Sequence, residues 1–177
     1  MIKKIFLGVS IIIILFVAYF SAIMANSRIQ SPAESVNATM EGVEVTVDYS
    51  RPYKKGRKIF GGLVPYGKYW RTGANDATEI SFSKDVYFAG QLVKAGKYWL
   101  YTIPGEEEWT VVLNTELGAW GLPGPNPTLD VLSLKVTAVS LPQSTEQFKI
   151  SLEPIKESLD LQMIWDNLQV SVQITLK

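Results

Sequence analysis

An uninterrupted run of 20 uncharged, largely apolar residues, from Ile5 to Met24, most constrains what this chain can fold into. The run follows directly after Lys3 and Lys4. A helix rises about 1.5 Å per residue, so a helix of this length spans roughly 30 Å, the thickness of a bilayer's hydrocarbon core. A helix that packs on a soluble core keeps a polar face, and this run shows none. Residues 5–24 are therefore predicted to contact a membrane.

The two lysines decide the predicted orientation. Because they stay on the cytoplasmic side, everything after Met24 is sent to the opposite side of the membrane. We therefore expect an inner-membrane anchor, with the rest of the chain on the extracytoplasmic, periplasmic side. The alternative is a signal peptide cleaved at Ile23-Met24-Ala25, which would leave a secreted protein.

The remaining chain has the usual size of one domain, and its apolar residues follow a strand pattern. From Val43 to Tyr49, Val and Tyr alternate with Glu, Thr and Asp, which is typical of a half-buried strand. Similar alternation recurs around residues 80–82, 109–113, 132–136, 148–152 and 170–176. The segment 98–103 is apolar or aromatic at every position except Thr102 and should be a central strand.

Turn signals separate these segments, at Ala89-Gly90, Ala95-Gly96, Pro104-Gly105, Leu141-Pro142 and Asp166-Asn167. The stretch 118–127 is rich in Gly and Pro and is predicted to be a loop. Short strands at this spacing predict an all-β fold, an antiparallel β-sandwich or barrel-like domain behind one N-terminal hydrophobic helix. The predicted division is therefore residues 1–25 as anchor or signal peptide and residues 31–177 as a single extracytoplasmic β domain.

The amino-acid composition excludes more kinds of catalytic and metal-binding site than any motif does. The chain contains no Cys and no His, which excludes thiol nucleophiles, imidazole bases and structural zinc sites. After the two N-terminal lysines, 15 cations stand against 17 anions, so no nucleic-acid partner is expected. No metal site and no cofactor is predicted, and any catalysis would need carboxylates, Lys, Tyr or Arg.

One long connection, residues 48–78, interrupts the alternation with the sequence DYSRPYKKGRKIFGGLVPYGKYWRTGANDAT. Together with Ser31-Pro32-Ala33 before it and the strand around Trp165 after it, this segment resembles the bacterial domain of unknown function 2911 family. The resemblance covers the chain from about residue 31 to its end. It implies an exported protein, and it implies no activity, because the family has none established.

The same connection is rich in cations, with four of them in the five residues from Lys54 to Lys58. If the loop folds back on itself, these side chains could form a pocket for a carboxylate, phosphate or sulfate, with Arg giving bidentate contacts. The alternatives are a solvated loop for the four clustered cations and internal ion pairs with Asp48 or Asp76 for the flanking arginines. The predicted ligand-binding residues of the loop are Arg51, Arg57, Lys58, Arg71, Asn75 and Asp76.

Two further features suggest chemistry. Trp120 lies in the Gly/Pro loop, where it could stack on a sugar ring or close the end of the sandwich. Asp48, Asp76 and Glu79 include two carboxylates that could act as the acid and base of a glycosidase, although exposed carboxylates are common in any domain of this size. The other tryptophans fall in strand patterns and are predicted to be core residues.

Three hypotheses for function follow. The first is a non-enzymatic, membrane-anchored module of the cell envelope that binds a small molecule, a glycan or an envelope protein through the loop from Arg51 to Asp76. The second is a carboxylate-dependent hydrolase or lyase that acts on polysaccharide. The third is a structural subunit of a membrane complex, in which the N-terminal helix itself is an interaction surface.

Overall fold

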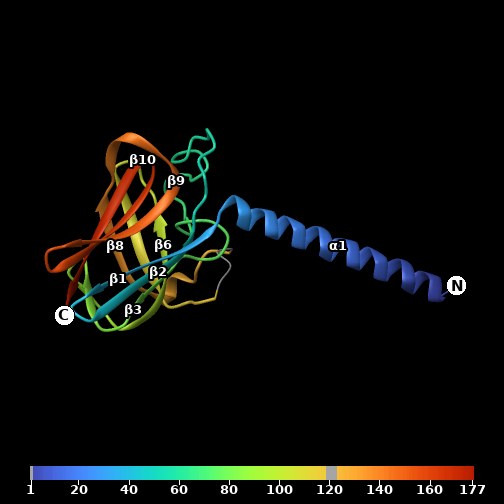
Figure 1. Cartoon of the computed structure of the whole chain (residues 1–177), viewed down its shortest axis with the longest axis horizontal. Coiled ribbons are helices and arrows are strands. Elements are labelled where there is room, and N and C mark those ends of the chain that lie inside the picture. The colour runs from blue at the N-terminus through green and yellow to red at the C-terminus, as the bar shows by residue number, and fades with distance from the viewer. Residues whose placement is uncertain (1, 119–122) are drawn as a thin grey trace.

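The computed structural model describes residues 2–118 and 123–177, with side chains from Ser10 onward. Within these ranges the chain forms one long helix, α1 (Ile2–Gln30), ten strands and a single 3₁₀ turn, η1 (Pro127–Leu129). Figure 1 shows the helix extending away from a two-layered body of strands. The predicted β-sandwich behind one apolar helix is confirmed.

All neighbouring strands of the two sheets pair antiparallel. The first sheet has six strands in the order β1 (Ala33–Met40), β2 (Val43–Ser50), β3 (Glu79–Phe82), β6 (Gly96–Ile103), β7 (Glu108–Asn114) and β8 (Asp130–Thr137). The second has four strands in the order β5 (Gln91–Val93), β4 (Val86–Phe88), β10 (Ser158–Leu176) and β9 (Val139–Ile155).

The core lies between the sheets and follows from the alternation in the sequence. On β2, Val43, Val45 and Val47 are buried, while the residues between them are exposed or half-buried. The largest fully buried side chains include Trp109, Phe148 and Trp165. As predicted, the tryptophans in strand patterns are core residues.

The strand β6 is central, as expected, and it is buried on both faces. Its side chains Tyr98 and Leu100 belong to the main core. On the opposite face, Trp99 and Tyr101 form a second buried cluster with Ala77 and Val112. Part of the outer face of the six-stranded sheet is therefore covered by the long connection that contains Ala77.

Two predicted turns are wrong and lie inside long strands instead. Leu141-Pro142 falls within β9, and Asp166-Asn167 falls within β10. The pairing of these strands is irregular there. Ser140 pairs with Leu168 and Thr145 with Asp166, so β9 has more residues between these two pairs than β10 has. The turn residues therefore form bulges, and Pro142 is tolerated because β9 is an edge strand.

The helix α1 is long and apolar enough to cross a membrane between Ser10 and Gln30, a test that a signal sequence also passes. It continues six residues beyond Met24, where the apolar run ends. Of its described side chains, none belongs to either buried cluster of the sandwich. The helix ends where β1 begins, beside the loops at one end of the sandwich (Figure 1).

Candidate functional site

The connection between β2 and β3, residues 51–78, is a long loop held in place by its own apolar side chains. Ile59, Phe60 and Trp70 are buried in the main core. Short bridges join Tyr53 to Gln147 of β9 and Trp70 to Thr102 of β6. The loop is thus fixed to both sheets although it contains no strand of its own.

The last part of this loop needs unusual backbone angles. Thr72 and Asn75 have φ values of 58° and 57°, and Gly73 has a φ of 154°. A β-branched residue with positive φ is rare, and Thr72 is held there by a buried hydrogen bond of 3.0 Å from its hydroxyl to that of Thr102. The turn closes on itself, since the Thr78 hydroxyl donates to the carbonyl oxygen of Thr72 at 2.7 Å.

A pocket of about 620 Å³ lies between this loop and the C-terminal end of α1. Such a volume is in the range of ligand-binding clefts. Arg57, Arg71 and Asn75, three of the residues predicted from the sequence, line it together. Ser27, Gln30 and Ser31, from the end of α1 and the residue after it, also line it.

Two tryptophans line the pocket from the core side. The rings of Trp70 and Trp165 are nearly parallel, with an angle of 19° and centroids 5.8 Å apart. The Nε1–H of Trp70 donates to the carbonyl oxygen of Gly73 at 3.1 Å, which fixes the indole against the loop. The predicted core role of both residues is confirmed, and they also give the pocket an apolar wall.

The charged side chains that line the pocket are cationic. Arg57 donates from Nε to the carbonyl oxygen of Lys54 at 2.9 Å, and from Nη2 to that of Tyr53. Arg71 donates from Nη1 to the carbonyl oxygen of Asn75 at 2.6 Å. Lys55 is the third cation, and no Asp or Glu occurs among the described lining residues.

The polar end of α1 is joined to the rim of the pocket. The Ser27 hydroxyl donates to Oδ1 of Asn75 at 2.5 Å, and Nδ2 of Asn75 donates to the carbonyl oxygen of Ser31 at 3.0 Å. Arg28 and Asp76 form an ion pair of 3.3 Å, and Lys55 Nζ donates to Gln30 Oε1. The loop and the helix end therefore form one continuous polar contact.

The other predicted residues lie elsewhere. Arg51 forms an ion pair of 2.5 Å with Glu34 and donates from Nε to the carbonyl oxygen of Phe148 at 3.2 Å. An internal ion pair is thus present at Arg51, with Glu34 as its partner and neither Asp48 nor Asp76. Lys58 is exposed and does not line the pocket. Trp120 lies outside the described residues.

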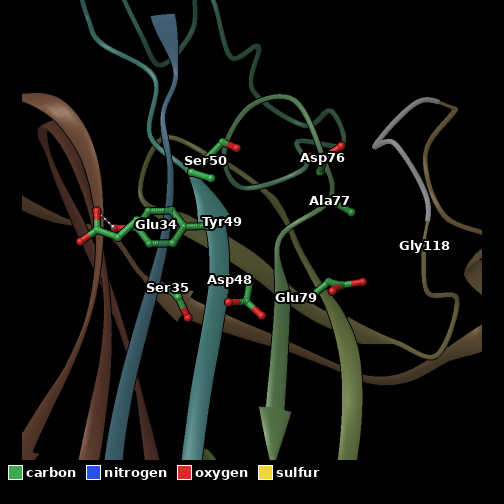
Figure 2. A pocket seen from close by; sticks show the side chains of 10 residues that line it. Glu34, Ser35, Asp48, Tyr49, Ser50, Asp76, Ala77, Glu79 and Gly118 are labelled. Atoms are coloured by element: carbon green, nitrogen blue, oxygen red, sulfur yellow. Dashed lines mark hydrogen bonds between the residues drawn. The ribbon is translucent and has the colours of Figure 1, made fainter. Parts of the chain in front are cut away.

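Figure 2 shows a second pocket, of about 560 Å³, over the first strands of the six-stranded sheet. Glu34, Asp48, Asp76 and Glu79 line it, so the three carboxylates considered for a glycosidase do lie in one depression. Lys97 is 2.5 Å from Glu79 and 3.9 Å from Asp48.

The carboxylates of this acidic pocket are all paired with cations. Asp76 is paired with Arg28 and Glu34 with Arg51, while the hydrogen bond to Glu79 raises the pKa of Lys97. Within the described part of the chain, no group of three His, Cys, Asp or Glu side chains is placed to hold a metal ion.

Sequence reasoning missed the contribution of the helix end. The segment of residues 27–31 is polar except at Ile29, is separated from the apolar run only by Ala25 and Asn26, and has no periodic pattern that would place it. The only signal is its composition, since Ser, Arg and Gln after an apolar helix mark the point where the chain enters water. Which loop it meets depends on the pairing of β1 with β2, a long-range contact.

The resemblance noted in the sequence is confirmed by comparison with protein families. A family model described as protein of unknown function (DUF2911) matches residues 31–174, which include nearly the whole sandwich. Comparison with curated proteins and with solved structures finds no match. The matched segment contains the loop and both tryptophans of the pocket. By the extent of this match, the chain belongs to the DUF2911 family.

Proposed function

We propose that this protein is a non-enzymatic binding module of the cell envelope, anchored by α1 with its β domain on the extracytoplasmic side. The pocket between the loop and the helix end is its ligand site. The ligand is a small molecule with an anionic group and an apolar part. The observation that supports this most directly is the pairing of an apolar wall, Trp70 and Trp165, with cationic side chains in one pocket.

The cations suit an anion for a physical reason. Arg57 uses Nε and Nη2 for backbone carbonyls, so its guanidinium is held in one orientation before any ligand arrives. A guanidinium fixed in this way loses little conformational entropy on binding a carboxylate or a phosphate. The described lining residues include three cations and no carboxylate, so their net charge favours an anion.

A hydrolase or lyase is the alternative, and it would use the acidic pocket. The observation in its favour is that Asp48, Asp76 and Glu79 line one depression. A general acid or base must lie within hydrogen-bond reach of the substrate, and an ion pair competes for the oxygens that would make this contact. Lys97 pairs with two of these carboxylates and Arg28 with the third, which makes the alternative the weaker proposal.

The test is a thermal-shift screen of the full chain in detergent micelles against dicarboxylates, uronic acids, sugar phosphates and neutral sugars. A ligand present at about 100 times its dissociation constant adds about 2.7 kcal/mol to the free energy of unfolding. We expect anionic compounds alone to shift the midpoint, and the shift to be lost in Arg57→Gln.

The matched control is Lys84→Gln, because Lys84 is an exposed cation in the turn after β3, at the end of the sandwich away from the loop. It should keep the full shift. A shift that Arg57→Gln retains, or a screen in which only neutral sugars bind, would contradict the proposed site.

A further inference from the structure

We infer that the ligand of the loop pocket is the phosphate headgroup of an anionic phospholipid in the leaflet from which α1 emerges. This inference rests on the proposed function, since it requires the pocket to be a ligand site and α1 to remain attached. It adds a source and a chemical class for the ligand. The observations that support it are the depth of the pocket relative to the apolar run, its charge and its apolar side chains.

The depth follows from helix geometry. The apolar run ends at Met24, and Ser27 and Gln30 lie three and six residues later on the same helix. At about 1.5 Å per residue, they are roughly 4.5 and 9 Å beyond the end of the run. The headgroup layer occupies roughly 5–8 Å on each side of the hydrocarbon core. Ser27 therefore lies within the headgroup layer and Gln30 just beyond it, and because both residues line the pocket, the pocket opens at the headgroup surface.

Direct contacts hold the loop at this depth. Asn75 bonds to Ser27 and to the carbonyl oxygen of Ser31, and Asp76 pairs with Arg28. The loop therefore cannot move away from the membrane surface without breaking these contacts. A soluble ligand would have to enter between the domain and the bilayer, whereas a lipid headgroup is already there.

The charge of the pocket matches this occupant. Lys55, Arg57 and Arg71 line the pocket, and the described lining residues include no carboxylate. A phosphodiester offers two non-bridging oxygens, which suits the planar fork of Arg. Basic groups close to an anionic leaflet are attracted within about one Debye length of it.

Apolar side chains at the same pocket suit the rest of a lipid. Leu63 lines the pocket and is 48% exposed, although a leucine gains from leaving water. Tyr53 and Trp70 also line it, and Tyr and Trp are enriched at the interface of membrane proteins. The glycerol and the first acyl carbons of a lipid would cover this apolar surface, which a free phosphate ion would leave exposed.

The experiment uses the full chain in nanodiscs of phosphatidylcholine alone or of phosphatidylcholine with phosphatidylglycerol. The readout is the difference in unfolding midpoint of the β domain between the two lipids, so the baseline stability of each variant cancels. At a lipid concentration about 100 times the dissociation constant, the expected rise is roughly 5–10 °C. A parallel arm adds glycerol phosphate or inorganic phosphate to the chain in phosphatidylcholine discs.

Two variants separate the pocket from general surface attraction. The double variant Lys55→Gln/Arg57→Gln removes two cations, and Ala74→Phe fills the pocket while leaving every cation in place, because Ala74 lines it. Lys84→Gln is the charge control at the other end of the sandwich. The inference expects the lipid effect to disappear in both pocket variants and to persist in the control.

The other possible outcomes would each contradict the lipid inference in a different way. A lipid effect that survives Ala74→Phe would mean attraction to the surface without pocket occupancy, and would overturn the inference. Stabilisation by soluble phosphates alone, lost in Ala74→Phe, would overturn the lipid source and leave the proposed ligand site standing. If neither lipid nor phosphate stabilises the domain, the inference fails, and the proposed ligand site then stands or falls on the carboxylate compounds of the thermal-shift screen.

Discussion

The hydroxyl of Tyr49 joins the two sheets of the sandwich. It accepts a hydrogen bond of 2.9 Å from the backbone N–H of Ile150, and lies 3.3 Å from the carbonyl oxygen of the same residue. Its ring is buried and meets Phe148 edge-on. Burial raises the pKa of Tyr49 to about 12. One side chain of β2 thus satisfies backbone groups of β9 in the opposite sheet.

We expect Tyr49→Phe to lower the free energy of unfolding by about 1–3 kcal/mol, because the buried N–H of Ile150 loses its acceptor. The neutral phenol is favoured in the folded state, so its stabilisation is complete below pH about 10 and is lost as pH rises through about 12. The variant should therefore lose less stability between these values than the natural chain. Chemical unfolding at pH 9 and 11 measures both effects.

The control for this prediction is Tyr87→Phe, since Tyr87 is exposed on β4. It should leave the unfolding free energy nearly unchanged. Equal slopes in Tyr49→Phe and the natural chain would contradict the prediction.

Asp166 stabilises the bulge of β10 through its charge. It accepts hydrogen bonds of 2.5 Å from Lys54 and 2.8 Å from Ser144. Burial alone would raise the pKa of Asp166, but these bonds outweigh it and hold the pKa below its ordinary value. The loop residue Lys54 is in this way fastened to the hairpin of β9 and β10.

We expect Asp166→Asn to lower the free energy of unfolding by about 1–2 kcal/mol at neutral pH, because the charge-assisted hydrogen bonds from Lys54 and Ser144 are lost. Asn accepts the positive φ of this position, 54°, so the backbone should stay in place. Because the folded-state pKa is lowered, the contribution is present above pH about 4 and disappears as pH falls through the folded value. The two chains should therefore converge in stability in acid, and a constant difference down to pH 2 would contradict this.

At the scale of elements, the loop of residues 51–78 depends on Gly73. A Cβ atom there would lie 2.9 Å from the carbonyl oxygen of Ser50 and 3.1 Å from the Thr78 hydroxyl, and the φ of 154° is strained for any other residue. We expect Gly73→Ala to cost about 2 kcal/mol or more and to disturb the pocket wall formed by Trp70. Thermal unfolding and near-ultraviolet circular dichroism check both.

The comparison is Gly67→Asn, where φ is 66° and nothing lies within 4 Å of an added Cβ. Since Asn accepts this region readily, the loss should stay below about 1 kcal/mol. If the two variants were equally stable, the close approach of Gly73 to Ser50 would not be what fixes the loop.

The elements differ in how far the sequence predicts them. The alternation at 43–49 and 170–176 predicts parts of β2 and β10 because one face of each strand is buried. The short strands β4 and β5 have three residues each, too few for a period to be recognised. Asp166-Asn167 has turn chemistry, and Asp166 does take a positive φ of 54°, but both residues stay within β10, and only the pairing with β9 shows this.

The candidate site divides in the same way. Arg57, Arg71 and Asn75 belong to one loop, so the local sequence suggests that they lie together, and all three do line one pocket. The partner of Arg51 is Glu34, which lies opposite Tyr49 in the register of β1 and β2. That register is a long-range property, so the sequence predicted the ion pair of Arg51 but named the wrong partners, Asp48 or Asp76. Ligand binding itself stays a prediction.

At the scale of the whole molecule, the helix and the sandwich meet through a small polar contact. This contact includes the hydrogen bond between Ser27 and Asn75 and the ion pair between Arg28 and Asp76. The side chains of Arg28 and Asp76 are 62% and 54% exposed. An exposed pair of this kind adds between zero and about 1 kcal/mol. All residues of the main core lie from Met40 onward, within the β domain.

We therefore expect residues 31–177 to fold without α1, with an unfolding midpoint less than about 5 °C below that of the full chain in micelles. The shortened chain keeps every core side chain and loses only the polar contacts of the helix end. Asn75→Gly in the full chain removes the bonds to Ser27 and Ser31 and accepts the φ of 57° at this position, so it should give a similar loss. If residues 31–177 stay unfolded while Asn75→Gly is stable, the helix must take part in folding, and the division of the chain into an anchor and an independent domain would be wrong.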